Sequence, residues 1–341
     1  MCILAVDLYA MMMKIIKFLK EWTLPCAIAF GTAVYLLFRF VPALDEAGNR
    51  LSGVMDQMLP LMIFLTLFVT FCKVDFKQMR LHRWHGGVIL AQVVLVALFM
   101  GAAYLLRGNA DHKVMAEAVL TCVIAPTAAA APVVSGKLGG NISTMTTLTL
   151  ISSLVAAVMI PAVFPLLENA VHTSFWVAFW IILKKMSNVL VLPLLLGWLV
   201  RHWVPKLHAW IVAQPNLGFY TWSCALSINV GITVKNIFNS GLTLWGLCFI
   251  ALASLVICFV QFGVGRGIGR VLGEEVNAGQ GMFQKNTGLA IWVAYIYLNP
   301  VASIGSGFYV LWQNIINSLE LWAYDKAEAQ RAQKPIDGQG S

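Results

Sequence analysis

The sequence predicts an all-α membrane protein with ten transmembrane helices, and three observations carry this prediction. The chain of 341 residues is 60% hydrophobic and only 11% charged, whereas soluble domains are about 25% charged. Apolar runs of about 20 residues, the length that crosses a bilayer, recur along nearly the whole chain. Two of these runs carry prolines or polar residues at mid-span, which predicts interrupted helices.

The apolar runs also fix the order of the spans. They lie at about 24–41, 54–72, 87–106, 114–137, 142–167, 187–204, 217–235, 243–265, 276–298 and 302–323. Before them, Lys14, Lys17 and Lys20 follow an apolar start, which is the reverse of the order in a signal peptide. Residues 11–22 are typical of an amphipathic helix at the membrane interface.

The ten spans divide into two similar sets of five. Each set opens with an amphipathic stretch and a span that contains a proline, Pro25 or Pro193, and its fourth span carries Thr127 or Thr287. Because five is odd, the second set must cross the membrane in the opposite direction, as in the inverted repeats of secondary transporters. We therefore expect an extension at 1–23, repeats at 24–172 and 173–325, and a cytoplasmic tail at 326–341. Ten unrelated helices are the alternative.

The distribution of basic residues predicts the orientation. Segments on the side of both termini hold 15 Lys and Arg, the opposite side holds seven, and Lys285 completes the 23. Basic loops accumulate on the cytoplasmic side, so both termini should face the cytoplasm of a plasma membrane, as in the inner membrane of a bacterium. This bias also explains the net charge of +8 without a nucleic acid partner.

The ninth span contains the most unusual stretch of the chain. It reads Gly281-Met-Phe-Gln-Lys-Asn-Thr-Gly-Leu289. A cation in mid-span costs roughly 3 kcal/mol or more unless it is paired or faces a water-filled cavity, so Lys285 is predicted to be a functional residue. Gly281 and Gly288 flank the polar residues and suggest a helix that stops and restarts. The alternative is that Lys285 snorkels or pairs with a carbonyl.

The fourth span predicts a second interruption. Pro126 and Pro132 lie six residues apart around Thr127 and a run of alanines, and each proline removes a backbone donor. If the two interrupted helices cross, the helix segments after Thr127 and Thr287 direct their N-termini into one cavity. Helix N-termini and an ammonium attract anions, so a substrate that carries a carboxylate is expected.

The other motifs of the chain give weaker evidence for a function. Gly263-Val-Gly-Arg-Gly-Ile-Gly269 resembles a nucleotide loop, but it ends a membrane span, so helix packing is the better interpretation. His82 and His85 share a basic loop and are expected to be solvated. The cysteines show no zinc spacing, and no carboxylates pair as a general acid and base, so we expect neither a metal site nor an enzyme.

At the residues of the ninth and tenth spans, the chain resembles the bile acid:sodium symporter family. The match is strongest over 281–322, including Gln-Lys-Asn-Thr-Gly-Leu-Ala and Leu-Trp-Gln-Asn-Ile-Ile-Asn-Ser-Leu, and moderate over 87–168. The resemblance implies a panel domain of spans 1, 2, 6 and 7, and a core domain of spans 3 to 5 and 8 to 10, with discontinuous helices 4 and 9 crossing in the core. It also implies transport of organic anions with sodium by alternating access.

The chain departs from the family at the implied sodium sites. The family has a glutamate upstream of a Gln-Asn-Ser/Thr-Gly motif, and an ungapped match puts Gly281 at that glutamate and Lys285 at the glutamine. Alignment on Gly140-Asn141 puts Ala131 and Pro132 at a Ser/Thr-Asn pair and retains Thr149 and Gln92. The positions of the implied cation sites are therefore Gln92, Ala131, Pro132, Thr149, Gly281, Gln284 and Lys285. An ammonium there would repel a sodium ion by several kcal/mol, so we hypothesise that Lys285 replaces the cation, as a fixed counter-charge or as a proton carrier.

The leading functional prediction is a sodium-independent secondary transporter of an organic anion, either bile-acid-like or a small organic acid, with no cofactor and with sodium or a proton as the candidate coupling ion. The candidate substrate residues are Thr127, Pro132, Ser135, Lys285, Asn286, Thr287, Gln313 and Asn314. The alternatives are a conventional sodium-coupled organic anion symporter, and a membrane sensor or partner-binding protein on the same fold that does not transport. The partners expected are the anion and the lipid bilayer, and a monomer is compatible with the sequence.

Overall fold

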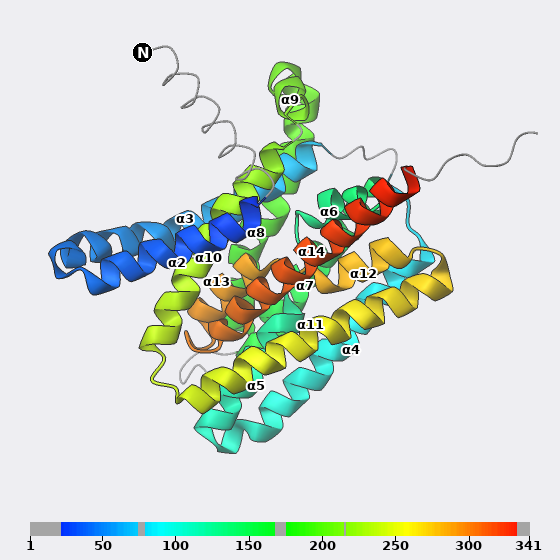
Figure 1. The fold of residues 1–341 in the computed structure, drawn as a ribbon. Coiled ribbons are helices and arrows are strands. Elements are labelled where there is room, and N and C mark those ends of the chain that lie inside the picture. Colours follow the sequence, from blue (N-terminus) through cyan, green and yellow to red (C-terminus); the bar gives the residue numbers. More distant parts are fainter. Residues whose placement is uncertain (1–21, 74–78, 168–174, 215, 333–341) are drawn as a thin grey trace, which may run out of the picture.

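The structure is a computed structural model that describes residues 22–73, 79–167, 175–214 and 216–332 (Figure 1). All regular secondary structure in these ranges is helical, apart from one isolated bridge between two residues. The amphipathic helix expected over 11–22 lies almost wholly outside them, as does the end of the expected tail.

Thirteen α-helices make up the described ranges, together with two short 3₁₀ turns. They are α2 (Thr23–Phe40), α3 (Asp45–Cys72), α4 (Arg83–Leu105), α5 (Ala110–Ile124), α6 (Ala131–Lys137), α7 (Ile142–Leu167), α8 (Phe175–Trp203), α9 (Pro205–Val212), α10 (Leu217–Asn239), α11 (Leu244–Leu272), α12 (Glu275–Phe283), α13 (Thr287–Tyr297) and α14 (Ser303–Ala332). The predicted fourth and ninth spans are each split into two helices, as expected.

Six of the described helices are long and apolar enough to cross a membrane. They lie within Glu46–Cys72, Arg83–Gly108, Ile142–Leu167, Phe175–Trp203, Leu217–Asn239 and Leu244–Leu272. Pro25–Phe40 and Thr287–Tyr297 are shorter apolar helices. Exposed tryptophans lie toward both ends of α8, at Trp176 and Trp180 and again at Trp198 and Trp203. Tryptophan gathers at both interfaces of a bilayer, so their positions also indicate a membrane protein.

Four helix boundaries lie seven or more residues from the prediction, including the start of α3 at Asp45, which was predicted at 54, and the end of α11 at Leu272, which was predicted at 265. α8 begins at Phe175, twelve residues before the predicted start at 187, because Lys184 and Lys185 are exposed on the helix surface and do not interrupt it. Charged side chains can keep their heads in water without ending a helix. α14 continues to Ala332, beyond the predicted end at 323, because its last turns are rich in Ala, Glu and Gln, which are strong helix formers.

The helices pack into two groups. In one, α2 and α3 lie against α10, and α3 also lies against α8; in the other, α11 packs on α12, α14 and α5, and α4 on α5. In Figure 1 the turn after α2 lies at the left and those after α4 and α10 lie toward the bottom left, whereas α9 lies at the top, and α6 and the C-terminal end of α14 lie toward the upper right. The helices therefore run between two opposite sides of the molecule.

The glycine-rich end of α11 packs against a helix, as the sequence suggested. A Cβ atom at Gly265 would lie 2.5 Å from the Ala278 carbonyl oxygen, and one at Gly269 would lie 2.5 Å from that of Glu274. Small residues at this spacing let two membrane helices approach closely. Here they bring α11 against α12.

His85 corrects the expectation of a solvated histidine. Its side chain is 2% exposed, and its Nε2 atom lies 3.0 Å from the Thr144 carbonyl oxygen of α7. Its Nδ1 atom accepts a hydrogen bond from the His82 backbone N–H. His85 lies in the first turn of α4, which packs against α7, and a basic sequence context does not reveal this contact.

Candidate functional site

The two interrupted helices meet at their interruptions. Thr127, between α5 and α6, forms an isolated antiparallel bridge with Lys285, between α12 and α13. The Ala128 N–H donates to the Gln284 carbonyl at 2.8 Å, and the Asn286 N–H donates to the Pro126 carbonyl at 2.8 Å. Unwound backbone at membrane depth needs such partners, and here each interruption supplies them for the other.

The chain unwinds between Gly281 and Gly288, but neither glycine is itself unwound. Gly281 and Gly288 are both helical, and α12 ends at Phe283 while α13 begins at Thr287. A Cβ atom at Gly281 would lie 2.2 Å from Leu148 Cδ2, and one at Gly288 would lie 2.7 Å from Asn229 Nδ2. The two glycines therefore allow close packing on α7 and α10, and the chain unwinds between them.

The restart of the first interrupted helix also lies later than expected. α6 begins at Ala131, four residues after Thr127, with Pro132 in its first turn. Proline suits the first turn of a helix because its missing N–H would have no partner there. In the second interruption, Asn286 caps α13, and its side-chain oxygen accepts from the Leu289 N–H at 3.2 Å.

Side chains from neighbouring helices hold both interruptions in place. Gln313 of α14 accepts from the Lys285 N–H at 3.0 Å and donates to the Lys285 carbonyl at 3.3 Å. Gln92 of α4 donates to the Ala125 carbonyl at 2.9 Å. The Thr127 hydroxyl links the two interruptions, because it donates to the Gly281 carbonyl at 2.8 Å.

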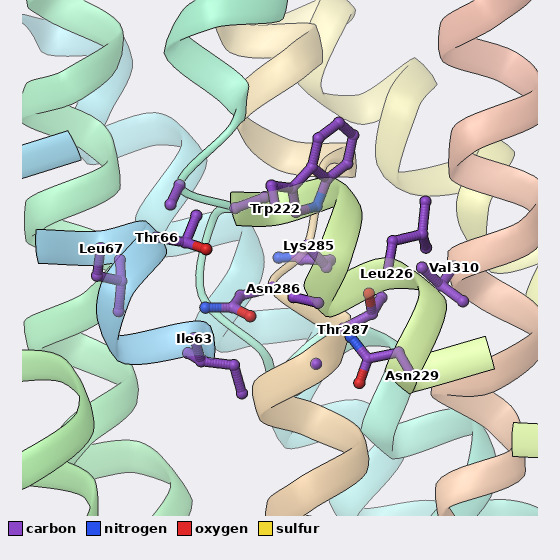
Figure 2. A pocket seen from close by; sticks show the side chains of 14 residues that line it. Ile63, Thr66, Leu67, Trp222, Leu226, Asn229, Lys285, Asn286, Thr287 and Val310 are labelled. Atoms are coloured by element: carbon purple, nitrogen blue, oxygen red, sulfur yellow. The ribbon is translucent and has the colours of Figure 1, made fainter. Parts of the chain in front are cut away.

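A cavity lies beside this meeting point, and Lys285 forms part of its wall. The cavity is small and partly open to the surface. The Lys285 side chain is 1% exposed, and its Nζ atom has no hydrogen-bond partner among the described residues. Figure 2 shows this side chain extended toward Thr66 of α3, with Asn286 and Thr287 beside it. An unpaired ammonium in such a wall favours an anion in the cavity.

The rest of the wall combines small, apolar and polar groups. α3 contributes Thr66, and α10 contributes Trp222 and Asn229 (Figure 2). The Asn229 Oδ1 atom is buried and accepts no hydrogen bond from the described residues. The cavity thus lies between the interruptions and the helix pair α3 and α10, and it offers a cation, amides, hydroxyls and an indole ring. A few polar groups in a largely apolar wall are typical of a site for a small organic molecule.

The structure brings together only part of the predicted substrate residues. Lys285, Asn286 and Thr287 line the cavity. Thr127 of the first interruption and Gln313 of α14 do not line the cavity. Both form hydrogen bonds to the segment around Lys285. Three further predicted residues lie outside the lining: Pro132 lies in the first turn of α6, Ser135 donates to the Asn277 side chain, and Asn314 donates to the Val310 carbonyl at 2.6 Å.

The polar side chains at the positions of the implied cation sites form hydrogen bonds within the protein. Thr149 donates to the Met145 carbonyl of its own helix at 3.1 Å, and Gln92 donates to Ala125. Gln284 donates to Gln280 and Asn317. Ala131, Pro132 and Gly281 offer no side-chain oxygen, and Leu148 fills the space beside Gly281. Gln92 Oε1 is buried and has no hydrogen-bond partner among the described residues, so it is an available acceptor, whereas three of the seven positions supply no side-chain oxygen and Lys285 supplies an amine.

Sequence reasoning missed the apolar residues of the wall, and among its polar and aromatic residues it missed Thr66, Trp222 and Asn229. Thr66 is a single hydroxyl in the apolar run of α3, and Trp222 is one of twelve tryptophans in the chain. Asn229 is one polar residue within the apolar run of α10. Neither Thr66 nor Trp222 carries a local signal, because the cavity forms only when α3 and α10 pack beside the interruptions.

Comparison with known proteins identifies the family of the chain. The profile of the Sodium Bile acid symporter family matches residues 60–260, which is more than half of the chain. The matched residues include the first interruption and end before α12, so Lys285 lies beyond them. A search of curated proteins finds no match.

Proposed function

Since the chain belongs to the Sodium Bile acid symporter family, whose members are transporters and not enzymes, we propose that it is a secondary transporter of a carboxylate-bearing organic anion. The substrate would be bile-acid-like or a small organic acid. Lys285 would attract its carboxylate, and transport would not require sodium. The observation that carries the proposal is the buried Lys285 side chain in the cavity wall, whose Nζ atom has no hydrogen-bond partner among the residues that the structure describes.

The charge balance of the cavity supports an anion. Of the polar residues in the wall, Lys285 is ionisable, and Thr66, Asn229, Asn286 and Thr287 are neutral. A carboxylate beside the ammonium would form an ion pair in place of an isolated buried charge. The attraction between the two charges would offset part of the cost of removing them from water. A cationic substrate would instead meet like-charge repulsion in a poorly screened site.

The replaced cation-site residues support sodium independence. Lys285 places a positive charge where the resemblance expects a neutral ligand, and packing by Leu148 leaves no room for a longer side chain at Gly281. The ammonium would serve as a fixed counter-charge for the substrate. A proton carried by Lys285 is the alternative coupling device.

The packing supports a division into two moving parts. α2, α3, α8 and α10 would form a panel domain, and α4 to α7 with α11 to α14 would form a core domain. The cavity lies where these two groups face each other. Ten membrane-spanning segments, arranged as repeats at 24–172 and 173–325, would then allow alternating access by movement of the core against the panel. The excess of Lys and Arg on one side would set both termini in the cytoplasm.

Thermal-shift screening of the purified protein against organic anions tests the proposal. Each anion is added in sodium chloride and in choline chloride of equal ionic strength, at two pH values. A bound anion stabilises the folded protein in proportion to its occupancy. We expect carboxylates to raise the melting temperature equally in both salts, and no effect from the matched neutral alcohols or amides. No stabilisation by any carboxylate would contradict the proposal.

The family description favours a second candidate, a conventional sodium-coupled anion symporter. In that case sodium would tighten anion binding, and the melting temperature would rise with anion only in sodium chloride. A sensor that does not transport would bind an anion but would show no uptake in proteoliposomes.

A further inference from the structure

A row of buried polar side chains on α10 continues past the end of the cavity. Asn229, Thr233 and Asn236 follow one another at four and three residues, so they share one face of the helix. All three are buried. Asn229 lines the cavity, whereas Thr233 and Asn236 lie beyond its lining, toward the end of α10 at Asn239. The polar wall of the cavity therefore extends toward the side of the molecule at which α10 ends (Figure 1).

α14 covers this row with small and hydroxyl-bearing residues. The Asn236 side chain donates to Ser303 Oγ at 2.8 Å. A Cβ atom at Gly307 would lie 2.2 Å from Thr233 Cγ2, so Thr233 fills the space beside that glycine. Ser303, Gly307 and the cavity residue Val310 recur at four and three residues, on the face of α14 that meets α10. We call the contact of Thr233 and Asn236 with Ser303 and Gly307 the α10–α14 seam.

A hydroxyl beside the seam has no partner. Ser306 lies three residues after Ser303 and four before Val310, so it borders the same face of α14. Its Oγ atom is buried and forms no hydrogen bond with any residue that the structure describes. A buried hydroxyl without a partner is unfavourable, and water would satisfy it if the two helices separated.

The contact between α10 and α2 is of a different kind. A Cβ atom at Gly31 of α2 would lie 2.1 Å from the Ser227 carbonyl oxygen, and one at Gly231 of α10 would lie 3.4 Å from the Gly31 carbonyl oxygen. Here small residues bring two backbones together, as in a tight membrane helix pair. In the α10–α14 seam the closest groups are instead side chains, and the Asn236–Ser303 hydrogen bond joins the helices. The seam is thus the contact of α10 that can open with less disruption.

We propose that the α10–α14 seam is a gate that closes the substrate path between the cavity and the side at which α10 ends, with the Asn236–Ser303 hydrogen bond holding it shut. The proposal rests on the proposed transport function and names the helices that separate. α10 packs with α2 and α3, whereas α14 packs with α11 and α13, so the seam lies between the two helix groups. Opening would expose Thr233, Asn236 and Ser306 to water, and polar residues inside a membrane protein are typical of such a path.

Chemical labelling tests whether the seam opens, without knowledge of the substrate. Ser306→Cys is expressed as the full chain in intact cells and treated from outside with a membrane-impermeant methanethiosulfonate reagent. Thr121→Cys is the matched control, because Thr121 of α5 is also buried and donates to the Ala118 carbonyl at 2.8 Å within the other helix group. We expect labelling of Ser306→Cys above that of the unchanged protein, and none above it for Thr121→Cys. Equal labelling of the two variants, at any level, would overturn the proposal.

A disulfide across the seam tests whether its opening is needed for transport. Because the two side chains are in contact, Asn236→Cys/Ser303→Cys brings two thiols within reach of each other, and copper phenanthroline oxidises them to a disulfide. Proteoliposome uptake of cholate and of butyrate is measured before oxidation, after it, and after reduction. We expect oxidation to reduce uptake to near background and reduction to restore it.

The control disulfide joins two helices of the same group. Asn277 of α12 donates to Thr144 Oγ1 of α7 at 3.1 Å, so Thr144→Cys/Asn277→Cys can be oxidised in the same way, and its uptake should not change. Uptake that persists across the oxidised seam, or falls equally in the control, would overturn the gate and leave the proposed transport function in place. Absence of uptake by the unchanged protein would count against the transport function, while the labelling of Ser306→Cys would still decide whether the seam opens.

Discussion

The two interrupted helices meet at one place, but they bring different groups to it. Between α5 and α6 the chain contributes Pro126, Thr127 and a run of alanines, none of them charged. Between α12 and α13 it contributes Gln284, Lys285 and Asn286, of which Lys285 and Asn286 line the cavity. The first interruption is six residues long, and the second is three.

This difference indicates a division of roles. Small residues in the first interruption let its backbone approach the backbone of the second interruption closely. The backbone N–H and C=O groups of the two interruptions then form hydrogen bonds with each other. The second interruption, held on both sides of Lys285 by Gln313, presents the charge. We therefore expect changes at Lys285 in the second interruption to alter anion binding, and changes at Pro126 and Thr127, which do not line the cavity, to alter stability alone.

Lys285→Met should give the largest effect. Loss of the ammonium removes a charge-assisted contact of about 1.5–3 kcal/mol, so anion affinity should fall about 10–150-fold. The same change should raise the melting temperature of the anion-free protein, because an isolated buried charge is removed. Titration calorimetry and thermal unfolding measure the two effects.

Lys137→Met is the matched control, because Lys137 ends the first interrupted helix and is exposed. Its anion affinity should match that of the unchanged protein. Equal losses in both variants would mean that net charge, and not the position of Lys285, attracts the anion.

The two glutamines that hold the interruptions should differ in their effect on stability. Gln313→Leu removes two hydrogen bonds to the Lys285 backbone and should lower the free energy of unfolding by about 1–3 kcal/mol. Gln92→Leu removes one hydrogen bond, to Ala125, and should cost about 0.5–1.5 kcal/mol. Melting temperatures of the two variants give the order, and a larger fall for Gln92→Leu would reverse the proposed division of roles.

Thr127→Val should have a smaller effect. It keeps the shape of the side chain but removes the hydrogen bond to the Gly281 carbonyl, at a cost of about 1 kcal/mol. Anion affinity should remain unchanged, because Thr127 does not line the cavity. Measured loss of affinity without loss of stability would place Thr127 in the binding site instead.

Pro132→Ala should have the smallest effect. Proline in the first turn of α6 restricts the unfolded chain, so its replacement should lower stability by about 0.5 kcal/mol. Thermal unfolding in detergent should show a shift near the limit of detection. A fall comparable to that of Gln313→Leu would mean that Pro132 holds the first interruption in place.

Much of this arrangement could be predicted from the sequence. Apolar runs located most helices to within a few residues, and α7 agrees at both ends. Prolines and polar residues located both interruptions because lipid makes such residues unfavourable in an intact span. The start of α8 was wrong because Lys184 and Lys185 resemble a loop but lie exposed on a helix.

The tertiary contacts of the site could not be predicted in the same way. The break between Gly281 and Gly288 depends on how Leu148 and Asn229 pack against those glycines. Thr66 and Trp222 join the wall only through the placement of α3 and α10. The Asn236–Ser303 hydrogen bond joins residues 67 positions apart, and nothing local in the sequence connects them.

Uptake by proteoliposomes tests most directly whether the Lys285 charge replaces sodium. An anion identified by thermal shift is offered to liposomes that contain the unchanged protein or Lys285→Met, with sodium or choline as the external cation. We predict equal uptake in both salts by the unchanged protein and near-background uptake in both by Lys285→Met. Uptake that requires sodium, or that persists without Lys285, would contradict the account.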